Sequence, residues 1–187
     1  MTAVREETVA AYLEALASTR AVPGGGSAAA LAAAMGAALM SMVAKLSARK
    51  AKTPEDRRVL DALVPSFDTL RDRFADLSQQ DIEAYRQVVE ARKAGAPAAE
   101  IEKAYERAAE VPLQTAEAVD ECLGLAAQVS ARAWEMTASD LAVGSELLQT
   151  AIGGALGNVA INLPELHGER ARRIEQRYLR LRNRPQD

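Results

Sequence analysis

The chain has few aromatic residues and a single cysteine, and both shortages limit its fold and its setting. Only 4% of its 187 residues are Phe, Trp or Tyr, although 49% are hydrophobic. The interior must therefore be built from alanine and aliphatic side chains, which favour closely packed helices, whereas sheets favour β-branched and aromatic residues. Cys122 has no second cysteine for an intrachain disulfide, so we expect a reducing compartment, the cytoplasm.

Several other features are missing from the sequence. It shows neither the alternation of a β-strand nor an internal repeat. With one histidine and one cysteine it lacks the ligands of a zinc site, and we predict no metal. The net charge of −3 argues against a general nucleic-acid binder. Residues 28–44 carry no charge, but alanine adds little to membrane insertion, so we expect a buried helix and no membrane partner.

What the sequence does contain is a succession of helical patterns. Apolar residues recur in alternating steps of three and four from Leu60 to Val88 and again from Ile101 to Val129. Ser27 and Thr53 are placed as N-caps, and Pro54 suits a first helical position. These patterns predict an all-α fold, a closed bundle of about five to six long helices forming one domain over residues 1–187. The predicted helices cover about 4–18, 27–50, 54–92, 101–129, 139–163 and a basic C-terminal helix at 165–183.

One polar residue interrupts the first of these apolar patterns. Asp81 takes a position whose upstream equivalents, from Leu60 to Leu77, are apolar. A carboxylate inside a bundle is costly unless it is paired, and burial raises its pKa, which suits acid–base chemistry. Alternatively, the helix ends near Ser78 and Asp81 caps a new one. Spacing alone leaves the two interpretations equal.

A second group of polar and small residues shares one face of the predicted helix 139–163. Small side chains allow a second helix or a flat ligand to come close, and an asparagine amide can both donate to and accept from a heterocycle. A tight helix crossing, with Asp140 as N-cap, explains the same spacing, and periodicity alone favours it. The face comprises Asp140, Gly144, Leu147, Ala151, Gly154, Asn158 and Asn162.

The alanine-rich helix has a glycine-rich start and a basic end. A P-loop needs a lysine after its last glycine and a strand before its first, and a dinucleotide fingerprint needs a βαβ unit; residues 23–26 have neither context. What remains is an open helix N-terminus, whose free N–H groups favour an anion or a carbonyl oxygen. The basic residues at the other end either cap the helix or hold an anionic tail: Lys45, Arg49, Lys50 and Lys52.

Five segments carry a family resemblance. They are "AVPGGGSAAALAAAMGAALMSMVAKLS" at 21–47, "DIEAY" at 81–85, "VPL" at 111–113, "SDL" at 139–141 and "ALGNVAINL" at 155–163. In this order they resemble the methenyltetrahydrofolate cyclohydrolase and formiminotetrahydrofolate cyclodeaminase family. Its members typically read Pro-x-Pro-Gly-Gly-Gly-Ser, followed by an alanine-rich helix that ends in Ser-Met-Val. The resemblance extends over nearly the whole chain.

The resemblance implies an all-helical homodimer that acts on a tetrahydrofolate derivative, with no cofactor beyond that substrate. The implied reaction is hydrolysis of 5,10-methenyltetrahydrofolate to 10-formyltetrahydrofolate. Asp81 would be the general base or the partner of the substrate's cation, and Lys50 the acid or the ligand of the glutamate carboxylate. The remaining substrate-binding residues would be Gly24, Gly25, Gly26, Ser27, Asp140, Asn158 and Asn162.

The resemblance also leaves alternatives. Cyclodeamination of 5-formiminotetrahydrofolate has the same electrophilic carbon between two nitrogens; without a formiminotransferase domain within these 187 residues, we favour the hydrolase. The chain departs from the family at residues 49–53, where a Gly-Lys-Lys-x-Tyr segment is common, and at 135–138, where Gly-Asn is frequent. These departures motivate a third interpretation from another class, a non-catalytic folate-binding or structural helical dimer.

Overall fold

The computed structural model describes residues 4–184, and this part of the chain contains helices and no strand. The predicted all-α fold is therefore confirmed. The elements in chain order are α1 Val9–Leu16, α2 Gly25–Lys50, α3 Pro54–Lys93, α4 Ala98–Ser130, the 3-10 helix η1 Glu135–Thr137, α5 Ala138–Asn162, the 3-10 helix η2 Leu163–Glu165 and α6 Gly168–Arg182.

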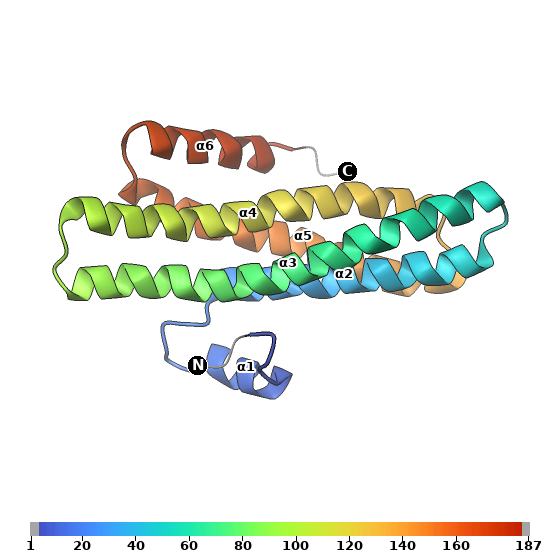
Figure 1. The fold of residues 1–187 in the computed structure, drawn as a ribbon, viewed down its shortest axis with the longest axis horizontal. Helices are drawn as coiled ribbons and strands as arrows, with labels where there is room; N and C mark the ends of the chain where they lie inside the picture. Colours follow the sequence, from blue (N-terminus) through green and yellow to red (C-terminus); the bar gives the residue numbers. More distant parts are fainter. Residues whose placement is uncertain (1–3, 185–187) are drawn as a thin grey trace.

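Four long helices form an antiparallel bundle (Figure 1). α2 packs against α3 and α5, and α4 packs against the same two helices, so consecutive helices joined by short loops lie side by side. α6 runs along the outside of α4, while α1 stands apart from the bundle near the start of α2 (Figure 1). This arrangement places the N-terminal turn of α2 beside the middle of α3 and the last turns of α5.

The core is built from small residues and a few large ones, as the shortage of aromatic residues predicts. On α2, Ala30, Ala33 and Ala37 are fully buried, which lets the neighbouring helices approach closely. Both phenylalanines of the chain, Phe67 and Phe74, lie on α3 and are fully buried. The burial of alanine on one helix against large side chains on the next explains how so few aromatic residues fill the interior.

Of the two predicted N-caps, Thr53 is confirmed and Ser27 is wrong. Thr53 precedes α3, and its side chain accepts a hydrogen bond from the Asp56 N–H at 3.1 Å. α2, however, begins at Gly25 after the N-cap Gly24, three residues before the predicted cap. Ser27 therefore lies inside the first turn and is fully buried. Glycine needs no side-chain cap to start this helix, which frees the serine hydroxyl for contacts between helices.

Other helix ends differ from prediction by a few residues. α1 is shorter than the predicted 4–18 and is capped by Thr8. α5 follows Thr137 as its N-cap, so Asp140 lies in the first turn and is not the cap. The C-terminal helix starts at Gly168 because Pro164 lies in η2 instead.

α3 settles how Asp81 is held. The helix runs without interruption for 40 residues from Pro54 to Lys93, and Pro65 lies inside it. The alternative in which a helix ends near Ser78 and Asp81 caps a new one is therefore wrong. Asp81 projects from the middle of a long helix whose other seam positions are packed in the core.

The α2–α5 contact is a close crossing, as the small residues of α5 predict. A Cβ added at Gly36 would lie 2.8 Å from Leu148 Cγ and 3.0 Å from the Gly144 carbonyl oxygen, so only glycine fits there. By length and composition α2 is the one helix in residues 4–184 that could cross a membrane, and 56% of its most apolar stretch is buried within the bundle. The bundle interior accounts for its apolar character.

Candidate functional site

The candidate site centres on Asp81, whose carboxylate lies against the first turn of α2. A Cβ added at Gly26 would come within 2.7 Å of Asp81 Cγ, so the carboxylate occupies the space that any other residue would fill. The N–H of Ser27 donates a hydrogen bond to the same carboxylate. Glycine at this position is thus required by the close approach of a charged side chain.

The electrostatic environment of Asp81 is that of a desolvated acid. The side chain is half-buried, and no salt bridge to it occurs within residues 4–184. Burial raises the pKa of Asp81 to about 6, and the hydrogen bond from the Ser27 N–H opposes that rise in part. A carboxyl group with this pKa can take up a proton and release it near neutral pH.

A chain of buried hydroxyl groups adjoins the carboxylate. Tyr12 from α1, Ser27 from α2 and Ser78 from α3 are all buried. The Tyr12 hydroxyl lies 3.0 Å from Ser27 Oγ, and Ser27 Oγ lies 2.7 Å from Ser78 Oγ. Burial raises the pKa of Tyr12, and the charge of nearby Asp81 adds to the rise. The tyrosine is therefore neutral at physiological pH.

The two asparagines of α5 lie at the same end of the bundle. Asn158 Nδ2 would be 3.4 Å from a Cβ at Gly25, which puts this side chain at the glycine turn. Asn158 donates to the Gly154 carbonyl at 2.9 Å, and Asn162 donates to the carbonyls of Ala108 and Asn158 at 3.1 Å and 2.7 Å. These bonds fix both amides and leave their oxygens to accept from a ligand.

Two predicted site residues lie far from Asp81 within the chain. Lys50 ends α2, 24 residues after Gly26, which is about 36 Å along a helix. Asp140 lies in the first turn of α5, about 27 Å from Asn158 by the same rise. A single chain therefore brings together the glycine turn, Asp81 and Asn158 but neither Lys50 nor Asp140.

Lys50 belongs to a separate surface hollow of about 470 Å³. Its Nζ lies 5.4 Å from the centre of the Trp134 ring, a cation–π contact. The Trp134 backbone N–H donates to Ser47 Oγ at 2.9 Å, which fixes the segment before α5 against the end of α2. The hollow is cationic on its α2 side through Lys50 and Lys52.

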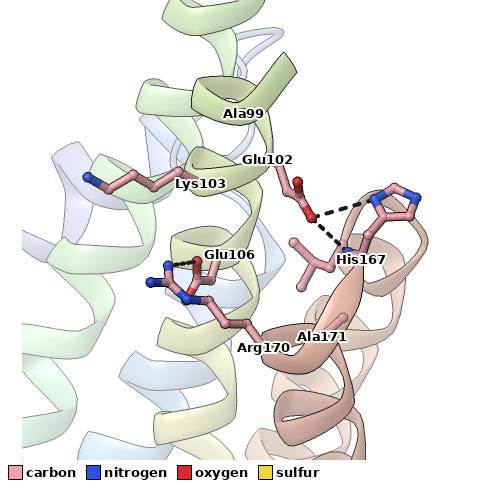
Figure 2. Close-up of a pocket in the computed structure, with 8 residues that line it drawn as sticks. Ala99, Glu102, Lys103, Glu106, His167, Arg170 and Ala171 are labelled. Carbon is pink, nitrogen blue, oxygen red and sulfur yellow. Dashed lines mark hydrogen bonds and ion pairs between the residues drawn. The ribbon is translucent and has the colours of Figure 1, made fainter. Parts of the chain in front are cut away.

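A second hollow, between α4 and the start of α6, contains none of the predicted residues. Figure 2 shows Glu102 accepting from the backbone N–H of His167, at 2.8 Å, and Arg170 paired with Glu106 at 2.9 Å. The His167 side chain is exposed. These contacts attach the start of α6 to α4. No group of three His, Cys, Asp or Glu side chains suited to a metal occurs within the described range 4–184.

Sequence patterns did not single out Tyr12 and Ser78, which adjoin the Asp81 site, or Trp134, which contacts Lys50. Ser78 precedes Asp81 by three residues, so it lies on the same face of α3, and a polar residue at this spacing is a readable signal. Tyr12 fits the apolar face of an amphipathic helix and carries no such signal. Its contact with Ser27 arises from the loop that folds α1 back toward the bundle.

Comparisons with known proteins identify similar chains. A family model described as formiminotransferase-cyclodeaminase matches residues 8–178. The methenyltetrahydrofolate cyclohydrolase of Methylorubrum extorquens is 33% identical over 164 residues, which cover 83% of this chain and 79% of that protein. The formimidoyltransferase-cyclodeaminase of Dictyostelium discoideum is 33% identical over 161 residues, 83% of this chain. The chain spans only 30% of that longer relative.

The fold also has a solved counterpart. A crystal structure titled as the formiminotetrahydrofolate cyclodeaminase of Thermotoga maritima superposes with a TM-score of 0.85 at 24% sequence identity. The match covers 96% of each chain. This likeness concerns the fold, and it includes the bundle that holds Asp81 against the glycine turn.

Proposed function

Because the chain belongs to the formiminotransferase-cyclodeaminase family of folate one-carbon enzymes, we propose that it hydrolyses 5,10-methenyltetrahydrofolate to 10-formyltetrahydrofolate. The relative from Methylorubrum extorquens, which carries the name of this hydrolase, matches the chain over most of both lengths. The substrate is a tetrahydrofolate derivative. The proposal includes no metal and no cofactor beyond the substrate, and a cytoplasmic location remains a prediction.

The observation that carries the proposal is the position of Asp81. Its pKa is raised to about 6 by burial, and its carboxylate faces the open N-terminus of α2. At pH 7 about nine tenths of such a group is ionised, so it can accept a proton from water. Its conjugate acid is strong enough to return that proton to a ring nitrogen. One residue thereby serves both halves of the reaction.

The reaction balances with Asp81 as the only proton carrier. The bridge carbon of the substrate is a cation shared by two nitrogens, and water adds to it as Asp81 removes one proton. The carbon–nitrogen bond to the pterin ring then breaks, and the Asp81 carboxylic acid protonates the departing nitrogen. The remaining hydroxyl proton passes to solvent as the formyl carbonyl forms. The whole reaction consumes one water molecule and releases one proton.

The first turn of α2 supplies the binding groups nearest to Asp81. The N–H groups of Gly25 and Gly26 are among the first four of the helix, which have no partner within it and favour an oxyanion or a carboxylate. Gly24, as N-cap, keeps this turn free of side chains. The amide oxygens of Asn158 and Asn162 would accept from the amino group and ring N–H of the pterin.

Lys50 and Asp140 enter the proposal through a second copy of the chain. α2 and α5 expose an apolar surface, which we name the α2/α5 face, comprising Met35, Met42, Val143 and Ile161. A homodimer with a two-fold axis crossing this face would bring the end of one α2 to the start of the other. Lys50 and Asp140 of one copy would then approach Asp81 of its partner.

The nearest alternative is the cyclodeaminase reaction. The longer relatives carry that activity in their names, and both reactions use a carbon between two nitrogens. Purified chain incubated separately with 5,10-methenyltetrahydrofolate and 5-formiminotetrahydrofolate distinguishes them by the absorbance of the methenyl group. We expect the absorbance of 5,10-methenyltetrahydrofolate to disappear faster with the protein than without it. Formation from the second with ammonia release, and no effect on the first, would contradict the hydrolase proposal.

A non-catalytic folate-binding dimer is the second alternative. The two segments that depart from the family pattern contribute residues 50–52 and Glu135 to the hollow around Trp134, away from Asp81 within the chain. Calorimetry that detects folate binding while both assays show no turnover would favour this alternative. The intact arrangement of Asp81 at Gly26 favours the enzyme.

A further inference from the structure

Three buried hydroxyl groups meet at the first turn of α2, and each comes from a different helix. Tyr12 of α1 is 7% exposed, whereas Ser27 of α2 and Ser78 of α3 have no exposed surface. Ser27 Oγ lies within hydrogen-bond distance of both other hydroxyls, at 3.0 Å from Tyr12 and 2.7 Å from Ser78. Buried polar groups are costly unless they are paired, so these contacts constrain one another.

The turn that they meet needs an anchor. Its N-cap Gly24 makes no side-chain hydrogen bond, and Gly25 and Gly26 follow without side chains to pack. Glycine loses the most backbone freedom on folding, so a glycine turn left alone is prone to fray. Ser27 is the first side chain of α2, and its own N–H is the group that holds the Asp81 carboxylate.

The hydroxyl contact is also a main attachment of α1. Figure 1 shows α1 apart from the four-helix bundle. Val9 and Leu13 on α1 are 77% and 56% exposed, whereas Tyr12 points inward and is buried. Just before α1, Arg5 pairs with Asp76 on the surface of α3 at 2.7 Å. Tyr12 is thus the inward contact by which α1 reaches the glycine turn.

We propose that Tyr12 is a positioning residue, which together with Ser78 clamps Ser27 so that the Ser27 N–H stays aimed at the Asp81 carboxylate. Only the expected effect of Tyr12 on the reaction rate rests on the proposed function. The clamp itself is a property of the folded chain. Tyr12 does not touch the reacting atoms; it acts through Ser27.

The groups around Asp81 fix the direction of the expected effect. α1 contributes the neutral Tyr12, α2 contributes the Ser27 N–H, and α5 contributes the uncharged Asn158 amide near Gly25. The Ser27 N–H favours the ionised carboxylate, while burial favours the protonated one. Removing the Tyr12 hydroxyl weakens the contribution of the Ser27 N–H. The burial of Asp81 stays unchanged, because phenylalanine keeps the aromatic ring. The pKa of Asp81 should therefore rise further.

A titration of Asp81 in the full chain tests the clamp without any folate. Carboxyl-labelled aspartate would be followed by NMR against pH in the wild type, Tyr12→Phe and Ser27→Ala, with Asp81→Asn used to identify the resonance. We expect the pKa of Asp81 to rise by about half a unit to one unit in both variants, since part of one hydrogen bond is lost. Tyr178→Phe, on the distant α6, is the matched control and should leave the titration unchanged.

Two results would overturn the proposal. An unchanged pKa in folded Tyr12→Phe would mean that the hydroxyl only helps α1 to pack. A lower pKa would mean that α1 merely shields Asp81 from water. Because this titration needs no turnover, it stands even if the chain hydrolyses no folate. If hydrolysis occurs, the acid limb of the rate profile should move upward with the titration while KM stays within about twofold.

Discussion

Asp81 is an acid at a position of α3 where its helix otherwise buries apolar side chains. Sequence spacing identifies the exception but leaves open whether the helix breaks there. The 40-residue course of α3 removes that ambiguity. The sequence does not record the surroundings of Asp81, because the groups around it come from α1, α2 and α5. Polar residues within an apolar pattern therefore indicate where a site lies better than they indicate what surrounds it.

The raised pKa of Asp81 predicts a dependence of stability on pH. Below its ordinary value of 3.8 the group is protonated in both the folded and unfolded chain and costs nothing. As pH rises from 3.8 to about 6, the unfolded chain ionises first, so the folded state loses stability. Asp81→Asn removes this cost. We expect it to raise the free energy of unfolding by about 1 to 3 kcal/mol at pH 7.5 and by little at pH 3.5.

Urea unfolding at the two pH values measures this effect. Asp61→Asn is the control, because Asp61 lies on the surface of the same helix and pairs with exposed Arg57. That change should alter stability by less than about 0.5 kcal/mol at either pH. A loss of stability in Asp81→Asn at pH 7.5 would show that the folded chain favours the charged form.

At the scale of elements, α2 connects most of the argument. Its alanine content, the absence of charge from residues 28–44 and the glycines at its start are readable in sequence, and they correctly predict a buried helix. The wrong N-cap has a physical cause: Ser27 bonds to two other helices, and no local pattern records a partner so distant in sequence. The small residues of α5 correctly predict a close helix crossing, since Gly36 and Gly144 meet there.

The crossing predicts opposite effects for two glycine substitutions. Gly36→Ala places a methyl group 3.0 Å from the Gly144 carbonyl oxygen and 2.8 Å from Leu148 Cγ, so α2 and α5 must separate. We expect a loss of about 1 to 3 kcal/mol in the free energy of unfolding. Gly124→Ala, on α4, meets nothing within 4 Å and should stabilise the chain by up to about 1 kcal/mol. Equal effects in thermal or urea unfolding would contradict the close crossing.

At the scale of the whole molecule, the bundle separates the predicted residues into two groups along its length. Gly25, Gly26, Asp81 and Asn158 lie together at the start of α2, and Lys50 lies at the end of α2. The separation of the glycines from Lys50 already follows from the predicted length of the one helix that carries them. The meeting of Asp81 and Asn158 with the glycine turn could not be predicted, because it follows from the antiparallel course of α2, α3 and α5.

The exposed α2/α5 face leads to a prediction about assembly. Met35 is 55% exposed in the single chain, and we expect it to be covered by a second copy. Light scattering after size exclusion should give twice the chain mass for the wild type and the mass of one chain for Met35→Glu, since a buried charge opposes the contact. Gln176→Glu adds the same charge on α6 and should remain a dimer. A monomeric wild type would remove Lys50 and Asp140 from the proposed site.

The most direct test of the account is turnover of 5,10-methenyltetrahydrofolate by the wild type and by Asp81→Asn across pH 5 to 8, after subtraction of the rate without protein. If Asp81 is the proton carrier, wild-type kcat/KM should fall below a midpoint near pH 6, where the carboxylate becomes protonated. The folded Asp81→Asn variant should lose at least about 100-fold at pH 7. Undiminished hydrolysis by that variant would contradict the account.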